Sequence, residues 1–275
     1  QYYERNPFYF KVDPEGNQLP YIDSVDVRYA SSMEVINMRA ISGELSAATR
    51  DLLLVNYPVL RDNREKGEYQ LLIGASERGA DLALAFNQNH PDPVLKEIFC
   101  DLRFRQAMSV AIDRNEINEL LYLGQGTPRQ ATVPDSASFF KQEWADAYAQ
   151  YDPDLANSLL DEMGLDKRGA DGTRLRPDGE PLAFLLEFTG TQGPFNETCQ
   201  LVVKTWAKVG IKCEVKEGQK AYVSQRLSAG EHDATMWVVD RTLERAAWSM
   251  GWNGAKLAPG GGSIINYCKA WQDWK

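Results

Sequence analysis

The chain has 275 residues, of which 43% are hydrophobic and 25% charged, and its net charge is −9 at pH 7. This length allows one large domain or two ordinary ones, and the composition is typical of a soluble globular protein. The negative charge and scattered basic residues argue against nucleic acid as a partner, since phosphate binding needs clustered Lys and Arg. No apolar run approaches the roughly 20 residues of a membrane span.

The first eighty-odd residues alternate between patterns typical of strands and of helices. Residues 24–31 alternate apolar and polar side chains, which predicts a half-buried strand, and residues 33–43 have helical periodicity and end at a glycine. A short strand over 44–49, a helix over 56–66 and an extended run over 81–89 follow. This alternation indicates an α/β lobe.

The stretch DLRFRQAMSVAIDRNEI, residues 101–117, predicts two consecutive helices. Asp101 can cap the first helix, and Asp113 opens the second with a glutamate three residues later, which is the spacing of a capping box. The helical periodicity predicts that Phe104, Met108 and Ala111 are buried.

The second half of the chain again alternates between strand and helix. Residues 152–164 predict a helix with Pro in its first turn and Gly at its end, and residues 167–181 predict a polar loop or hairpin. The remaining apolar and amphipathic runs predict strands at 182–190, 211–218 and 232–240, with helices at 195–209 and 219–231. We therefore expect two α/β segments, residues 1–85 and 86–275.

The sequence contains none of the common catalytic motifs, such as GxSxG, HExxH or a P-loop lysine. The two histidines have no metal-ligand pattern, and we expect His232 at the surface or in a turn. The four cysteines form no CxxC pair, which argues against a zinc site, and they allow one disulfide of undetermined pairing if the protein is exported. A glycoside-processing enzyme acting on oligosaccharides is the alternative, because carboxylates are plentiful and their separation in the fold is not visible in sequence.

Aromatic residues are frequent near the end of the chain. We expect most of them in the core or at interfaces and some in a ligand cleft, where a flat indole can cover a sugar ring or a peptide side chain. Six lie within forty residues: Trp237, Trp248, Trp252, Tyr267, Trp271 and Trp274.

Several segments in order resemble the bacterial extracellular solute-binding proteins, family 5, of ABC importers, in the branch that binds oligopeptides, dipeptides and oligosaccharides. The resemblance covers roughly residues 3–245. It rests on YERNPFYFKVDPEGNQLPYIDSVDVRY, INMRAISGELSAA, LALAFNQN, DLRFRQAMSVAIDRNEI, LGQGTP, YDPDLANSLLDEMG, LVVKTWAKVGIKCEV and YVSQRLSAGEHDATMW.

The resemblance implies an α/β fold of the periplasmic-binding-protein type (class II, cluster C), with mixed sheets flanked by helices in two lobes. Residues 1–85 would form the C-terminal part of an incomplete first lobe, and residues 86–275 the second lobe. Family members are usually about twice as long and carry a signal peptide, so we expect that both ends of this chain were cut. The helices of residues 101–117 would be scaffold that touches no ligand.

The resemblance also implies a function. The protein would bind an oligopeptide or oligosaccharide in an interlobe cleft by domain closure, and deliver it to the membrane permease of an ABC transporter. It would be a monomer without cofactor, metal or catalytic residues. Its precursor would be secreted, and the protein would be periplasmic or extracellular and membrane-associated.

Five residues are predicted to face the ligand: Asn87, Trp237, Asp240, Arg241 and Trp252. Asn87 follows an extended run, and Trp237 and Asp240 lie at the end of a predicted strand, where open α/β sheets bind ligands. Peptide binders of the family often hold peptide termini with an Arg and an Asp near this strand. Asp240 and Arg241 are out of that register, and the aromatic-rich end of the chain fits an oligosaccharide at least as well.

Overall fold

The computed structural model describes residues 1–48, 52–74, 76, 78–190 and 193–239. The chain divides into two compact units, one of Gln1–Leu52 with Asn56–Leu71 and one of Leu53–Val55 with Leu72–Lys275. The expected boundary at residues 85 and 86 thus falls inside the second unit. The reason is that residues 80–86 pair with a strand more than 140 residues later in that unit.

The first unit begins with a two-stranded antiparallel ribbon, β1 (Tyr2–Glu4) and β2 (Ser24–Asp26), in which Tyr3 lies opposite Val25. Every residue of both strands is exposed. The strand predicted at residues 24–31 therefore exists, but it is shorter than predicted and not half-buried, since a two-stranded ribbon encloses no face of its own.

The predicted helix at residues 33–43 is confirmed as α1 (Met33–Ile41). The hydroxyl of Ser32 accepts a hydrogen bond from the backbone N–H of Val35 and caps its start. Gly43 follows its end with φ +74°, a left-handed conformation that glycine adopts without a steric penalty.

A short 3₁₀ turn, η1 (Leu54–Asn56), precedes α2 (Tyr57–Asp62), which confirms the core of the helix predicted at 56–66. The helices α1 and α2 pack together and bury Ala40 and Leu60. No strand forms in residues 44–48, the described part of the segment for which a strand was predicted.

The second unit is built on a four-stranded mixed sheet with the strand order β3-β6-β4-β5. The strand β4 (Ala183–Phe188) runs parallel to β5 (Lys212–Glu217) and to β6 (Ala234–Val239). The strand β3 (Ala80–Phe86) runs antiparallel to β6. This mixed sheet flanked by helices confirms the predicted α/β class.

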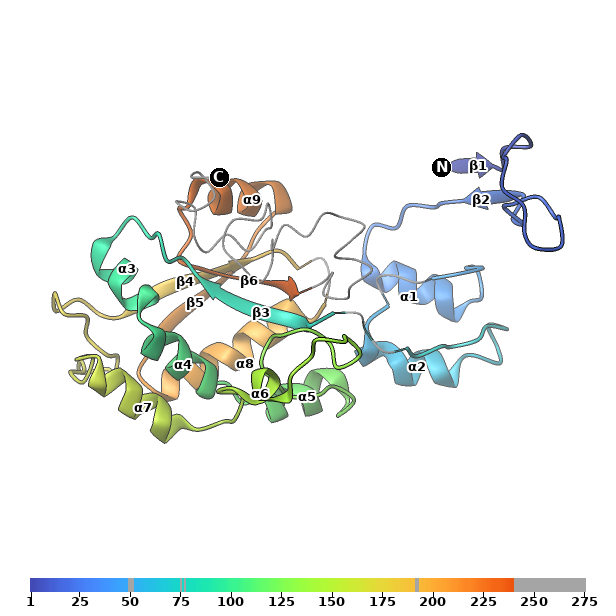
Figure 1. Cartoon of the computed structure of the whole chain (residues 1–275). Helices are drawn as coiled ribbons and strands as arrows, with labels where there is room; N and C mark the ends of the chain where they lie inside the picture. Colours follow the sequence, from blue (N-terminus) through green and yellow to red (C-terminus); the bar gives the residue numbers. More distant parts are fainter. Residues whose placement is uncertain (49–51, 75, 77, 191–192, 240–275) are drawn as a thin grey trace. The chain divides into compact units, whose positions relative to one another are not determined.

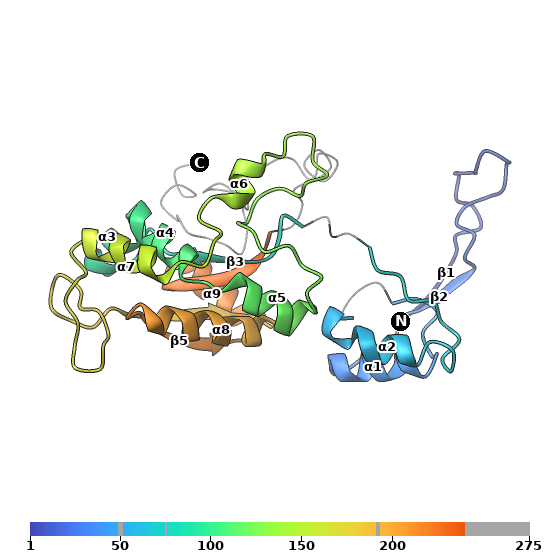
Figure 2. The same ribbon diagram turned by 90° about the horizontal axis from the view of Figure 1, so that it is seen from below.

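Helices cover both faces of this sheet. Figure 1 shows α4 and α8 on one face and α9 on the other, and Figure 2 shows α7 beside α4. In the described residues, the helices of the second unit are α3 (Pro93–Cys100), α4 (Leu102–Val110), α5 (Arg114–Tyr122), α6 (Gln142–Asp146), α7 (Pro153–Glu162), α8 (Phe195–Lys208) and α9 (Lys220–Ala229).

The two helix starts predicted within residues 101–117 are confirmed. The Asp101 carboxylate accepts a hydrogen bond of 2.8 Å from the Arg103 N–H at the start of α4. The Asp113 carboxylate accepts one of 2.9 Å from the Glu116 N–H at the start of α5. Each bond satisfies a backbone donor that has no partner within its helix.

The core of the second unit is a cluster of aromatic rings centred on Phe86. Its ring centroid lies 5.3 Å from that of Phe99, 5.1 Å from Phe104, 5.7 Å from Phe184 and 5.8 Å from Trp206. These rings come from β3, α3, α4, β4 and α8, so one cluster joins the sheet to three helices. Tilted and edge-to-face aromatic pairs stabilise a core beyond the area that they bury.

The segment predicted as a polar loop or hairpin at residues 167–181 is held by a buried arginine. The Arg174 guanidinium donates to the Val209 carbonyl at 2.8 Å and to the Asn157 side-chain oxygen at 2.7 Å. It also forms an ion pair with Asp161 and donates to the Leu165 carbonyl. These partners compensate for the burial of the charge.

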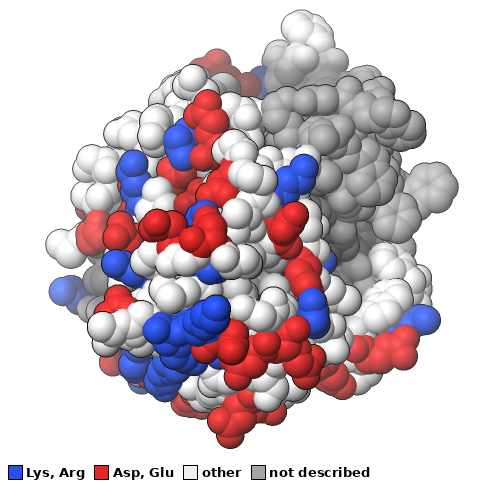
Figure 3. Space-filling view, turned by 90° about the vertical axis from the view of Figure 1, so that its left-hand side faces the viewer, with Lys and Arg blue, Asp and Glu red and all other residues white. Residues whose placement is uncertain are grey.

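Charges of both signs are interspersed on the face of the molecule seen in Figure 3. No broad basic surface forms on this face. None of the helices in the described residues is both long and apolar enough to cross a bilayer.

The burial of α4 leads to a stability prediction. Phe104 has 0% exposure and Leu102, in the same helix, has 57%. Phe104→Ala should lower the free energy of unfolding by about 3–5 kcal/mol, because it removes a ring from the aromatic cluster and leaves a cavity. Leu102→Ala, the matched control, should change it by less than about 0.5 kcal/mol. Urea unfolding followed by tryptophan fluorescence measures both, and equal losses would contradict this packing.

Candidate functional site

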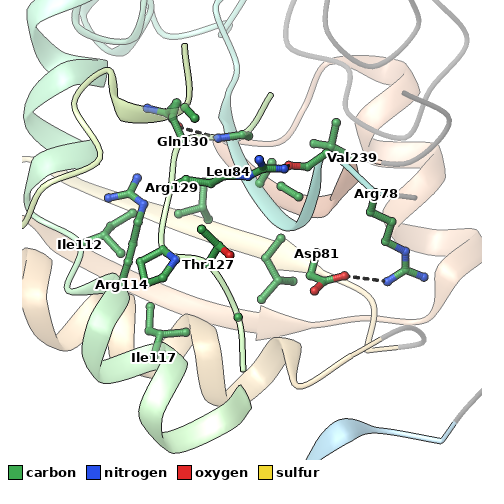
Figure 4. Close-up of a pocket in the computed structure, with 18 of the residues that line it drawn as sticks. Arg78, Asp81, Leu84, Ile112, Arg114, Ile117, Thr127, Arg129, Gln130 and Val239 are labelled. Carbon is green, nitrogen blue, oxygen red and sulfur yellow. Dashed lines mark hydrogen bonds and ion pairs between the residues drawn. The ribbon is translucent and has the colours of Figure 1, made fainter. Parts of the chain in front are cut away.

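A pocket of about 1140 Å³ lies within the second unit. Its walls come from β3, α4, α5, the chain between residues 125 and 135, and parts of α6, α8 and β6. Pockets for small molecules typically measure about 300–1,000 Å³, so this one has room for a solute larger than a single sugar or amino acid. Figure 4 shows the side chains that project into it.

Part of the pocket wall is apolar and belongs to the aromatic core. Phe86, Met108, Ile112, Val202 and Trp206 line it and are otherwise buried. The Trp206 indole N–H donates to the Met108 carbonyl at 2.9 Å, which fixes α8 against α4 at this place. The wall is therefore rigid, because each ring or alkyl group is held by the packed core behind it.

Two arginines at the pocket brace the helices around it. Arg105 donates to the Phe99 carbonyl at the end of α3 at 2.7 Å. Arg114 donates to the Ser109 carbonyl at 2.8 Å and to the Ala149 carbonyl at 3.2 Å. Burial lowers the pKa of Arg114 to about 10, so its guanidinium still carries its charge at neutral pH.

The Ser109 hydroxyl joins α4 to the chain that covers the pocket. It donates to the Tyr148 carbonyl at 2.8 Å, and it accepts from Arg114 Nη2 at 2.8 Å and from Gln130 Nε2 at 3.0 Å. The Gln130 N–H also donates to the Ala145 carbonyl at 2.8 Å. The Ser109 hydroxyl thus uses its one donor and both of its acceptor sites, and it holds residues 127–149 in place.

The glycines in LGQGTP turn the chain from α5 into the pocket wall. Leu123 and Gly124 end the helix with φ of +55° and +70°. The Asn118 side chain then bonds both backbone groups of Gly126, donating at 3.1 Å and accepting at 2.8 Å. A Cβ on Gly126 would lie 2.7 Å from the Asn118 Oδ1, so any other residue here would displace the side chain that makes these bonds.

Two more arginines line the pocket with different partners. Arg78 forms an ion pair of 3.4 Å with Asp81. The Arg129 guanidinium lies over the Phe140 ring, 5.7 Å from its centroid, and donates to the Gly79 carbonyl at 3.4 Å. Figure 4 shows both side chains at the pocket.

The chemistry of the lining is that of hydrogen bonding. The described lining residues include no His, Cys, Lys or Glu, and their polar groups are mainly guanidinium, amide and hydroxyl. Tyr122 lines the pocket, and burial raises the pKa of its phenol, so it stays neutral. Guanidinium, amide and hydroxyl groups around an apolar wall suit the binding of a solute.

Asn87 does not line this pocket, although its neighbours Phe86 and Gln88 do, and it is fully buried. Its amide nitrogen donates to the carbonyls of Gly230 and His232, both at 2.8 Å, and its oxygen accepts from the Asn89 N–H at 3.0 Å. The side chain thus ties the end of β3 to the turn before β6. Its contact with a ligand stays a prediction.

His232 is also fully buried, so of the two expected places, the surface or a turn, the surface is wrong. It precedes β6, which lies between β3 and β4 in the sheet and is buried along its whole length. Sequence alone does not reveal that this strand is central.

Trp237 is only 4% exposed and does not line the pocket. It lies opposite Ala83 in the sheet, and its ring packs edge-on against Phe195 at 6.1 Å. Asp240, Arg241 and Trp252 lie outside the described residues. The ligand contacts of all five predicted site residues stay predictions.

The pocket residues that sequence reasoning missed lie on α4 and on the following chain. Arg105 and Ser109 are four residues apart, on a side of α4 different from that of Phe104, so helical periodicity places them together. The sequence contains no comparable signal for Arg129 and Gln130, because their positions depend on the turn at residues 123–126.

The described residues contain no group of three or more His, Cys, Asp or Glu side chains that could hold a metal ion. Cys100, Cys199 and Cys213 are free thiols in this structure.

A carboxylate beside Asn87 gives a pH prediction. Burial would raise the pKa of Asp233, but hydrogen bonds from His90, at 2.8 Å, and from the Leu185 N–H, at 2.8 Å, outweigh it and lower this pKa. A carboxyl with a lowered pKa stabilises the fold above about pH 4, and this contribution is lost as the pH falls through the folded-state pKa.

Asp233→Asn should therefore lower stability at neutral pH and flatten its decline on acidification. Thermal unfolding between about pH 6 and pH 3 measures both effects. The exposed Asp166, replaced by Asn, serves as the control and should leave the profile as in wild type. A decline in Asp233→Asn as steep as in the parent would contradict the assignment.

The junction at Ser109 gives a second prediction. Ser109→Ala should cost about 1–3 kcal/mol and speed amide exchange in residues 127–149, because it leaves the Gln130 and Arg114 donors without their shared acceptor. Ser158→Ala on α7, where the hydroxyl donates only to the Asp154 carbonyl, is the matched control. Hydrogen exchange by mass spectrometry compares them, and unchanged protection of the segment would refute the role of Ser109.

Comparison with known proteins agrees with the fold. Residues 2–254 match the family described as bacterial extracellular solute-binding proteins, family 5 Middle. A probable ABC transporter-binding protein of Deinococcus radiodurans is 27% identical over 218 residues, which are 77% of this chain and 36% of that protein. A periplasmic alpha-galactoside-binding protein of Rhizobium meliloti is 25% identical over 268 residues, 94% of this chain and 38% of that protein.

Among solved structures, an oligopeptide-binding protein OppA superposes with a TM-score of 0.70 at 38% identity, covering 99% of this chain and 43% of the other. The chain thus spans about two fifths of the length of the relatives that it matches. The match to the family covers most of the chain, and the fold agrees with it. The chain belongs to the bacterial extracellular solute-binding proteins, family 5, which are binding proteins and not enzymes.

Proposed function

We propose that this chain is part of the solute-binding protein of an ABC importer and that it binds an oligopeptide or an oligosaccharide. The observation that carries the proposal is the pocket of about 1140 Å³ in the second unit, which combines a rigid apolar wall with guanidinium, amide and hydroxyl groups. Such a lining suits a solute that is partly apolar and rich in hydrogen-bonding groups.

The relatives support both solute classes. One is named for alpha-galactosides and another for oligopeptides, and this chain aligns with each over more than nine tenths of its length. In the complete protein the solute would lie in a cleft between lobes that close around it. The pocket of the second unit would hold part of it.

The proposed partner is the membrane permease of an ABC transporter, which would receive the solute from the protein. The proposed location is outside the cytoplasmic membrane, in the periplasm or at the cell surface, with a secreted precursor. The name of the Rhizobium meliloti relative, a periplasmic protein, supports this location.

Asp240, Arg241 and Trp252 stay candidates for solute contact in this proposal. Asn87 and Trp237 would need to leave the buried contacts described above before they could reach a solute. Asp240→Asn in the binding assay below addresses this end of β6, and an unchanged affinity would place the site elsewhere.

The proposal predicts a rise in melting temperature when a solute is added. The natural full-length protein should be screened with tri- to pentapeptides and with raffinose, stachyose and cello-oligosaccharides. A solute at 100 times its Kd stabilises the folded state by about 2.7 kcal/mol, which calorimetry resolves easily. Mass spectrometry of the recovered solute should show it chemically unchanged.

Two outcomes contradict the proposal. Shortened oligosaccharides after incubation would favour the glycoside-processing alternative. No thermal shift with any solute, together with no solute retained through purification, would argue against binding altogether.

A further inference from the structure

Among the described residues, the guanidinium of Arg129 is the cation at the pocket with the fewest partners. It is half-buried, lines the pocket and lies over the Phe140 ring. Its one hydrogen bond to a described residue is long, 3.4 Å to the Gly79 carbonyl. A guanidinium has five N–H donors, so most of the hydrogen-bonding capacity of Arg129 is unused.

The other arginines at the pocket are already engaged. Arg105 and Arg114 donate to main-chain carbonyls at 2.7 and 2.8 Å, and Arg114 also bonds the Ser109 hydroxyl. Arg78 is paired with Asp81. Within the described part of the chain, Arg129 has no carboxylate at ion-pair distance. It is therefore the arginine best able to take a new partner.

The charge of the lining points in the same direction. Four arginines and three aspartates line the pocket in the described residues, whereas the whole chain carries a net charge of −9. One of those aspartates, Asp81, is already paired with Arg78. The pocket lining thus carries a small excess of positive charge on an acidic protein, and this excess favours the binding of an anionic group.

The position of Arg129 suits a planar anion. Contact with the Phe140 ring holds the flat face of the guanidinium, which leaves its edge, where the N–H groups lie, free to bond. Two parallel N–H donors match the two oxygens of a carboxylate, and such bidentate pairs are stronger than neutral hydrogen bonds.

We propose that Arg129 binds a carboxylate of the solute in this pocket. The solute would then be a peptide with a free C-terminus or an acidic oligosaccharide, and a neutral sugar would gain nothing from this side chain. This inference rests on the proposed solute-binding function and narrows its ligand class.

The test uses matched probes with and without the carboxylate. Trialanine is compared with its C-terminal amide, and trigalacturonate with neutral stachyose, by calorimetric titration of the natural full-length protein. The variants are Arg129→Gln, Arg129→Lys and, as the control for loss of one charge, Lys96→Gln on the exposed side of α3. Arg129→Lys keeps the charge without the planar fork.

Arg129→Gln should bind the carboxylate probe about 10- to 100-fold more weakly, with Arg129→Lys between it and wild type and Lys96→Gln unchanged. The neutral counterpart should bind wild type and Arg129→Gln equally. Binding of trialanine would identify the carboxylate as that of a peptide, and binding of trigalacturonate would identify it as that of an acidic sugar.

Several outcomes overturn the inference. An unchanged affinity of Arg129→Gln for the carboxylate probe would do so, as would a neutral counterpart that binds wild type as tightly as its acid. Binding of stachyose alone, equally to wild type and Arg129→Gln, would overturn the role of Arg129 and leave the proposed function standing. If no probe binds and no solute is retained through purification, both the role of Arg129 and the proposed function are wrong.

Discussion

Contact between the Phe86 ring and four other rings is the constraint on which the second unit depends. Phe86 ends β3, and its neighbours Phe99, Phe104, Phe184 and Trp206 come from helices and a strand spread over more than 100 residues of sequence. Since the cluster fixes α4 and α8 against the sheet, it also fixes the apolar wall of the pocket. The pocket is therefore a consequence of core packing, and its shape should survive changes at its polar rim.

The polar side of the pocket depends on that packing in turn. Because Phe104 is buried in the cluster, Arg105 and Ser109 on another side of α4 lie at the pocket. Ser109 holds the segment of residues 127–149 through its hydrogen bonds with Gln130 and Tyr148. These groups have their hydrogen bonds made and serve as framework. Arg129 is carried on the same covering chain, yet its donors are mostly unused. Framework and free binding groups thus lie side by side, which is how a rigid scaffold positions a ligand contact.

Local patterns predicted the helices well and the long-range pairing poorly. Periodicity and caps placed the helices of residues 101–117 and the burial of Phe104, because both depend on neighbours three and four residues away. The predicted division at residues 85 and 86 did not take account of the pairing of β3 with β6, which spans more than 140 residues. The burial of His232 was not predicted, because the sequence of a short strand reveals neither the position of the strand in the sheet nor the elements that cover it. The position of Arg129 depends on a turn around Gly126 and had no sequence signal of its own.

The direction of β3 also separates Asn87 from the end of β6. Asn87 and the segment after Trp237 both follow strands, and the carboxyl ends of parallel strands would meet at one edge of the sheet. However, β3 is antiparallel to β6, so Phe86 lies opposite Ala234, while Ala80 lies opposite Val239. Asn87 is thus roughly 20 Å, the length of a seven-residue strand, from Val239. Arg78 and Gly79 lie at the Val239 end, and the Gly79 carbonyl accepts from Arg129. Arg129 therefore lies near the Val239 end of β6 and far from Asn87.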